Sequence, residues 1–155
     1  MAPPKLETIF DAVETNLLTV TTANGYNNDI VVVERQHQIR RIEQTPCFFI
    51  NVGRFPIEHR PARQRRITVI YTVLGGVCVD VDDDDTLFTT LASLAQDFDA
   101  VFYSDQYLIA ASGTGTRLLV DHKIEEYDTD EGFMAPKAIF IARCRLIYDA
   151  PEGSL

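Results

Sequence analysis

Two stretches of the chain repeat apolar residues at the spacing of one face of an α-helix. The first runs from Lys5 to about Val20, with a stripe of Leu6, Ile9, Phe10, Val13, Leu17 and Val20. The second is Asp82–Phe102, DDDDTLFTTLASLAQDFDAVF, whose apolar members are Leu87, Leu91, Leu94, Ala95, Phe98, Val101 and Phe102. This spacing predicts two amphipathic helices. The leading aspartates are expected to cap the second helix, and its polar positions are taken by Ser93, Gln96, Asp97 and Asp99.

Between and after these helices the chain has the β-branched runs and the apolar–polar alternation of strands. We expect strands over Ile30–Val33, Cys47–Val52, Arg66–Leu74, Val77–Val81, Arg117–Tyr127 and Ala138–Tyr148. Gly75 and Gly76 are expected to break or bulge the third of these runs. The segment Gly53–Arg65 contains two prolines, which cannot complete a central ladder, so it is expected to be an exposed excursion.

The order of elements predicts an α+β fold: one domain over residues 1–155, with a mostly antiparallel β-sheet and two α-helices packed on one face. A chain of 155 residues is long enough for one well-buried core. Residues 1–4 contain two prolines and no apolar pattern, and residues 149–155 follow the last alternating run. Both ends are therefore expected to be flexible.

Composition agrees with a globular protein, at 46% hydrophobic and 24% charged residues. No apolar run approaches the length of a membrane span, and MAPPKLETIF lacks the basic-then-apolar order of a signal peptide. We therefore expect a cytoplasmic chain without a membrane partner. Cys47, Cys78 and Cys144 are far apart and lie in apolar runs, which favours buried free thiols over disulfides or a metal site.

Charge is divided along the chain. The net charge of −9 argues against a dedicated nucleic-acid binder. Between Ile67 and Thr116 there is no Lys or Arg but eight aspartates, whereas the preceding RFPIEHRPARQRR carries Arg54, Arg60, Arg63, Arg65 and Arg66. These arginines either form a solvated loop or dock to carboxylates of a partner, because the planar guanidinium pairs with a carboxylate through two hydrogen bonds. Nucleic-acid binding by this loop is a weaker third option.

Motifs for catalysis or cofactors are weak. DVDDDDT has Asp85 and Leu91 where a calcium loop beginning at Asp80 needs glycine and glutamate. SGTGTR opens no helix and is too short for a dinucleotide fingerprint. The three histidines lie in polar or basic segments, and no serine or cysteine has an activating context. We expect no catalytic residue, metal or cofactor; a small cytoplasmic enzyme with a site near Ser112–Thr116 is kept as a less favoured alternative.

One succession of segments extends over most of the chain: KLETIFDAVETNLLTV, NGY, PCFFINV, RRITVIYTVLGGV, DDDDTLFTTLASLAQDFDAVF and TDEGFMAPKAIFIARCRLIYD. It resembles the tail terminator (tail completion) proteins of tailed bacteriophages. The resemblance implies a virion structural protein that forms a ring, usually a hexamer, on the head-proximal end of the tail tube. Such a ring stops tube growth, joins the tail to the neck or connector, and lets DNA pass through its lumen. It would assemble in the host cytoplasm. Other phage neck or head-completion proteins share parts of this profile and stay an alternative.

Under this hypothesis the two charge blocks have separate tasks. Carboxylates at a lumen or rim would repel passing DNA, and the candidates are Asp82, Asp83, Asp84, Asp85, Asp128, Asp130 and Glu131. The five arginines are candidates for contact with an adjacent subunit or with the tail tube protein. A ring of identical subunits joins one patch to a different patch on the next copy, which a chain with separate basic and acidic blocks can provide.

Overall fold

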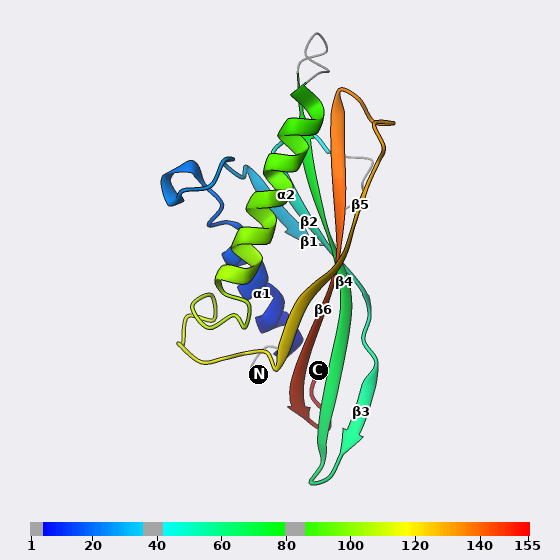
Figure 1. Ribbon diagram of the computed structural model, residues 1–155. Coiled ribbons are helices and arrows are strands. Elements are labelled where there is room, and N and C mark those ends of the chain that lie inside the picture. The colour runs from blue at the N-terminus through cyan, green and yellow to red at the C-terminus, as the bar shows by residue number, and fades with distance from the viewer. Residues whose placement is uncertain (1–4, 36–41, 80–85) are drawn as a thin grey trace.

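The computed structural model describes residues 5–35, 42–79 and 86–155. In these residues the chain forms two α-helices and a six-stranded sheet (Figure 1). The elements in order are α1 (Lys5–Leu17), the 3-10 turn η1 (Thr22–Asn24), β1 (Val32–Arg35), β2 (Cys47–Arg54), β3 (Ile57–Arg60), β4 (Gln64–Cys78), α2 (Leu87–Ser104), β5 (Asp121–Thr129) and β6 (Lys137–Pro151). The predicted α+β fold is confirmed.

Two long strands form the axis of the sheet. β4 and β6 are each 15 residues long and pair antiparallel over their whole length, from Gln64 opposite Pro151 to Cys78 opposite Lys137. The strand order is β1-β2-β4-β6-β5, and β3 pairs with β4 outside this path. Only the pairing of β1 with β2 is parallel among the strands of the described ranges. The long ribbon places the β3–β4 hairpin at the lower end of Figure 1 and the β5–β6 turn at the upper end.

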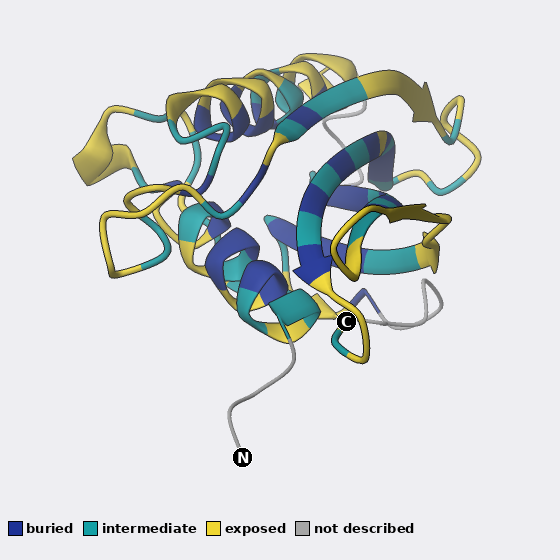
Figure 2. Cartoon of the chain, turned by 90° about the horizontal axis from the view of Figure 1, so that it is seen from below, coloured by how far each residue is buried: buried dark blue, intermediate teal, exposed yellow. Residues whose placement is uncertain are grey.

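Both helices lie on one face of this sheet, and the main core fills the space between the helices and the sheet (Figures 1 and 2). Ile67, Val69, Tyr71 and Val73 of β4 are buried in that core, as the period of two in a strand requires. Phe98 of α2 is fully buried, with ring centroids 5.6 Å from Phe48 and 5.7 Å from Phe140. The apolar stripe of α2 is therefore the surface that holds β2, β4 and β6 together.

The opposite face of the sheet is only partly covered. A small cluster of Ile42, Cys47, Phe49, Leu74 and Ile139 is buried there. Farther along, β5 and β6 carry ion pairs between neighbouring strands: Arg143 lies 2.7 Å from Glu126, and Arg145 lies 3.4 Å from Asp121. The prediction that the second face of the last strand is at least partly wet is confirmed.

The predicted break at Gly75 and Gly76 is wrong, because β4 runs through both residues without interruption. A Cβ atom on Gly75 would lie 2.2 Å from the ring of Phe140 on β6, and one on Gly76 would lie 3.0 Å from the Cys47 sulfur on β2. Glycine here makes room for side chains of the two neighbouring strands, as glycine does where another group approaches a strand closely.

The C-terminal segment, predicted to be flexible over residues 149–155, begins as the end of β6 and is hydrogen-bonded to the rest of the chain. β6 continues to Pro151. Arg66 donates two hydrogen bonds to the carboxylate of Asp149, at 2.8 and 2.9 Å. The Leu6 amide donates to the Leu155 carbonyl at 3.1 Å. The predicted excursion Gly53–Arg65 contains an exposed strand, β3, and becomes a hairpin with β4.

Three smaller predictions also need correction. Cys47 and Cys144 are buried free thiols as expected, but Cys78 is exposed. The first helix ends at Leu17, and the first strand spans Val32–Arg35 rather than Ile30–Val33. The predicted flexibility of residues 1–4 and the predicted capping of α2 by Asp82–Asp85 both fall outside the described residues.

Asp97, one of the predicted polar positions of the second helix, has its side chain buried under the loop that follows α1. Its carboxylate accepts hydrogen bonds from the backbone and side-chain amides of Asn27, at 3.0 and 2.8 Å, and from those of Asn28, both at 2.8 Å. Four N–H donors satisfy a buried charge that would otherwise be costly. Asp97 thus fixes the loop onto α2.

We predict that Asp97→Asn lowers the free energy of unfolding by about 2–4 kcal/mol, because the new amide group turns a donor toward N–H groups that then lack an acceptor. Chemical denaturation monitored by circular dichroism measures this. Asp99→Asn, at an exposed position two residues along the same helix, is the matched control. The asparagine oxygen can still accept from the Tyr127 hydroxyl, so stability should change by less than about 0.5 kcal/mol. Equal midpoints for the two variants would contradict the anchoring role of Asp97.

Candidate interaction surfaces

The β5–β6 turn forms an acidic end of the molecule, which we define by Asp128, Asp130 and Glu131. Asp128 and Glu131 are exposed. Asp130 is half-buried, and its carboxylate accepts hydrogen bonds from the amides of Met134, at 3.0 Å, and Ile139, at 3.2 Å. Asp130 therefore shapes the turn, while the other two carboxylates are available to a partner or to solvent. The remaining lumen or rim candidates, Asp82, Asp83, Asp84 and Asp85, lie outside the described residues.

The β3–β4 hairpin and Arg54, the last residue of β2, form the basic end, which carries the five predicted arginines. Two of them bind the chain itself. The Arg65 guanidinium donates to the Ser154 carbonyl. The pair that Arg66 forms with Asp149 lowers the pKa of that carboxyl, chiefly through the hydrogen bonds of the guanidinium.

The other three arginines, Arg54, Arg60 and Arg63, are exposed. Arg60 lies 3.6 Å from Glu58, a loose pair on the surface. Within the described part of the chain the guanidinium groups of Arg54 and Arg63 have no carboxylate partner. Arg63 lies at the hairpin tip, where it and Ala62 have φ values of 55° and 62°. These three side chains are the part of the basic block that a partner can reach.

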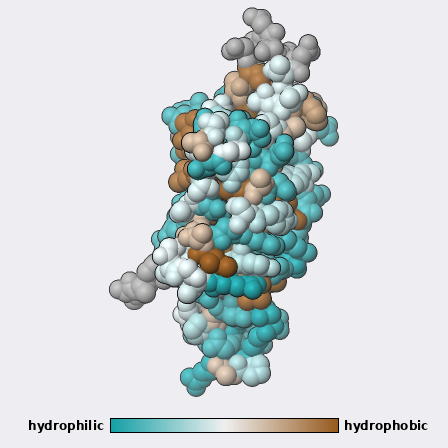
Figure 3. Space-filling model, turned by 60° about the vertical axis from the view of Figure 1, so that its left-hand side comes forward, coloured by the Kyte–Doolittle hydropathy of each residue, from teal (hydrophilic) through white to brown (hydrophobic). Residues whose placement is uncertain are grey.

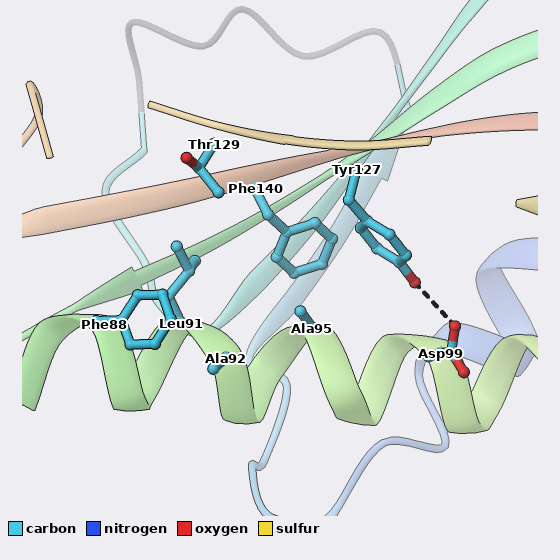
Figure 4. A pocket seen from close by; sticks show the side chains of 8 residues that line it. All are labelled: Phe88, Leu91, Ala92, Ala95, Asp99, Tyr127, Thr129 and Phe140. Carbon is cyan, nitrogen blue, oxygen red and sulfur yellow. Dashed lines mark hydrogen bonds between the residues drawn. The ribbon is translucent and has the colours of Figure 1, made fainter. Parts of the chain in front are cut away.

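An apolar groove runs between α2 and the edge strand β5 (Figure 4). Its volume is about 190 Å³, and it is lined by Phe88, Leu91, Ala92, Ala95, Asp99, Tyr127, Thr129 and Phe140. The Tyr127 hydroxyl donates to Asp99 across one end of the groove at 3.2 Å. A second cavity of about 150 Å³ continues past Phe88 to Asp130, Glu131 and Gly132. The acidic end thus carries apolar surface as well as carboxylates.

A larger pocket lies beside the start of α1, with a volume of about 440 Å³. We call it the α1 pocket, and its lining residues are Leu6, Glu7, Phe10, Arg35, Val52, Phe55 and Leu155. Arg35 is already held by Asp11 and Glu14, at 2.6 and 2.7 Å. Because Arg35 is already paired, the wall that remains for a partner is mainly apolar. Arg54 adjoins Phe55 in the sequence.

Elsewhere on the surface, apolar residues are scattered. On the face drawn in Figure 3 they form small patches separated by hydrophilic surface, and one patch lies at the upper end of the molecule. The most exposed large apolar side chains are Phe133, at 89%, and Phe88, at 77%. Phe88 lines the groove and its extension, and the residue before Phe133, Gly132, lines that extension. Exposed aromatic residues therefore accompany the carboxylates of the acidic end.

A buried polar cluster lies inside the core. His122 was expected in a polar segment but is only 3% exposed. Its Nδ1 lies 2.9 Å from the Gln106 carbonyl, which can only accept, so Nδ1 carries the proton. Nε2 therefore accepts from the Tyr71 hydroxyl, 2.5 Å away. Burial lowers the pKa of His122 to about 4. The imidazole is neutral, and both of its nitrogens are satisfied.

Cys47 and Cys144 are not activated as nucleophiles. Burial raises the pKa of Cys144 to about 12 and that of Cys47 to about 11. A thiolate is the nucleophilic form, so both side chains are inert at neutral pH. His122, Tyr71 and Cys144 line none of the three pockets described above.

The turn proposed as an alternative enzymatic site has its hydroxyl groups bonded to one another. Ser112 Oγ donates to the Ile109 carbonyl at 2.7 Å, and Thr114 and Thr116 share a hydrogen bond of 2.6 Å. The described residues contain no group of His, Cys, Asp and Glu that could hold a metal ion. Among the described helices, none is long and apolar enough to cross a membrane.

No protein-family model matches the sequence, and neither does any curated protein. Support for a function therefore comes from the geometry and charge of the chain and from the resemblance stated above.

We predict that stability falls as the pH drops from 6.5 to 4, in part because of His122. In the unfolded chain this side chain has its ordinary pKa near 6.5, whereas in the folded chain the pKa is about 4. Between these values the unfolded chain binds the extra proton, which costs about 3 kcal/mol of stability once the pH reaches 4.

Unfolding by urea at several pH values between 4 and 7 tests this. His122→Gln should be less stable at pH 7 but should lose less stability on acidification than wild type. His59→Gln, at an exposed histidine, should follow the wild-type curve. Parallel curves for wild type and His122→Gln would show that His122 does not carry this pH dependence.

Proposed function

We propose that the chain is a virion structural protein, a ring-forming tail terminator that caps the head-proximal end of a phage tail tube. The ring would stop tube polymerisation and join the tail to the neck or connector. The observation that carries this proposal is the placement of unlike surfaces at opposite ends of one continuous sheet: carboxylates with exposed aromatic residues at one end, and unpaired arginines at the other.

Such a subunit favours assembly from head to tail. Two acidic ends repel each other, as do two basic ends, whereas an acidic end attracts the basic end of the next copy. When one patch of each copy contacts a different patch of the next copy, the copies form a ring if the rotation from copy to copy closes on itself. Because β4 and β6 pair over 15 residues, the two ends are held in a fixed relation to each other.

The overall charge suits a conduit for DNA. The chain carries 23 acidic and 14 basic residues. A multimer of this chain would accumulate negative charge, and a negative lumen repels the phosphate backbone instead of binding it. Two of the five arginines of the basic end, Arg65 and Arg66, are engaged within the chain, which reduces the basic surface that DNA could reach.

Another neck or head-completion protein would use the same surfaces with a different docking partner. The tail tube protein discriminates between these functions, because a terminator binds the end of the tube and a head-completion protein does not. For an enzyme we find less support. His122 and Cys144, whose pKa values are strongly shifted, are buried in the core. In the groove, partial burial raises the pKa of Tyr127, which keeps its hydroxyl protonated and makes it a poor base or nucleophile.

Light scattering of the purified chain, alone and with tail tube protein, tests the proposal. We expect a closed ring, either free or formed on tube ends, and tubes that stop lengthening when the chain is added. A chain that stays monomeric and leaves tube growth unchanged would refute the proposal. A ring that ignores tube ends would favour the alternative of another neck protein.

Charge reversal of the accessible arginines gives a second prediction. Arg54→Glu combined with Arg63→Glu should leave the melting temperature within a few degrees of wild type, because neither side chain has an ion pair to lose in the described chain. Assembly should be lost. Lys123→Glu, a charge reversal on the outer face of β5, is the control and should assemble. Normal rings from the double variant would show that the basic end takes no part.

A further inference from the structure

We infer that Phe133 of one copy inserts into the α1 pocket of the next copy. The inference rests on the proposed function, because it assigns the contact that would join subunits of the ring. The occupant of the pocket is thus a second copy of this chain, and its anchor is a single aromatic side chain.

Phe133 is the most exposed large apolar side chain among the described residues, at 89%. The turn that carries it is nevertheless well fixed. The Phe133 amide donates to the Asp130 carbonyl at 3.0 Å, and the Asp130 carboxylate accepts from Met134 and Ile139. An aromatic ring held out by a rigid turn loses little conformational freedom on binding, which is how interface anchors gain affinity.

The α1 pocket is large and apolar enough to receive this ring. Its volume is about 440 Å³, and Leu6, Phe10, Val52 and Phe55 contribute its apolar wall. An apolar cavity of about 150 Å³ in another protein already holds a benzene molecule. A phenyl ring can therefore enter the α1 pocket, and the remaining space can take part of the turn.

Phe133 cannot fill the pocket of its own copy. Val52 of the pocket pairs with Tyr71 on β4, whereas the β5–β6 turn lies at the other end of that strand, beyond Cys78 and Lys137. The stretch of β4 from Tyr71 to Cys78 alone is roughly 23 Å long at about 3.3 Å per residue. The contact is therefore between copies, and it joins two different surfaces.

Charge supports the same pairing. Glu131 lies two residues before Phe133, and Arg54 adjoins Phe55 at the pocket. Glu7 also lines the pocket, and Arg35 is held by Asp11 and Glu14, so the attraction depends on Arg54. Insertion of a projecting apolar residue into a pocket elsewhere on an identical molecule is the contact that builds rings or filaments.

Two variants test the contact from its two sides. Phe133→Ser removes the inserted ring, and Phe55→Glu places a carboxylate on the pocket wall, where Glu131 of the next copy would approach. Each should weaken self-association by about thirtyfold or more, the loss typical of an interface anchor. Circular dichroism should show an unchanged fold. Phe88→Ser, at the other strongly exposed phenylalanine of the acidic end, is the control and should associate like wild type.

Mixing the two variants gives the decisive result. Phe133→Ser keeps an intact pocket and Phe55→Glu keeps an intact Phe133, so an equimolar mixture should form a dimer of one copy of each and stop there. Normal rings from Phe133→Ser would overturn the inference and leave the proposed function standing. Two defective variants without a mixed dimer would also overturn it. A wild-type chain that forms no ring, alone or on tubes, would remove both the inference and the proposed function.

Discussion

The pairing of β4 with β6 is the constraint on which the rest of the structure depends. Fifteen residues of each strand are joined without interruption, through Gly75 and Gly76 on β4. The ladder sets the length of the molecule and places the basic hairpin and the acidic turn at its two ends. Because the ladder is continuous, neither end can move toward the other without breaking backbone hydrogen bonds. Separation of charge in the sequence thereby becomes separation of charge in space.

The core keeps this axis in place through apolar packing combined with a few buried polar groups. Phe98 of α2 packs against Phe48 and Phe140, and these contacts join the helix to β2 and β6. Asp97 and His122 are buried with their hydrogen bonds satisfied, Asp97 by the loop after α1 and His122 by Tyr71 and Gln106. A fully satisfied polar group specifies one arrangement, since any other leaves a buried charge or donor unpaired. The surfaces at the two ends are therefore presented by a rigid body.

The sequence predicted the fold class because hydrophobic periodicity is a local signal, and both helices and most strands were found near their expected positions. It failed where the outcome depends on residues distant in the chain. Gly75 looked like a break because its partner, Phe140, is on another strand. Asp97 looked like any other polar position of the second helix because the amides of Asn27 and Asn28 that bury it come from another loop. For the candidate surfaces, the sequence identified the five arginines. Only the structure separates Arg54, Arg60 and Arg63, which are exposed, from Arg65 and Arg66, which hold the C-terminal segment.

One relation between copies underlies the proposed assembly: unlike ends of neighbouring molecules meet around an opening. Electron cryo-microscopy of the chain bound to tail tube ends measures that relation directly. We predict a ring in which the acidic turn of each copy lies against the α1 pocket and the hairpin of the next. A ring in which like ends meet, or an absence of density at the tube ends, would contradict it.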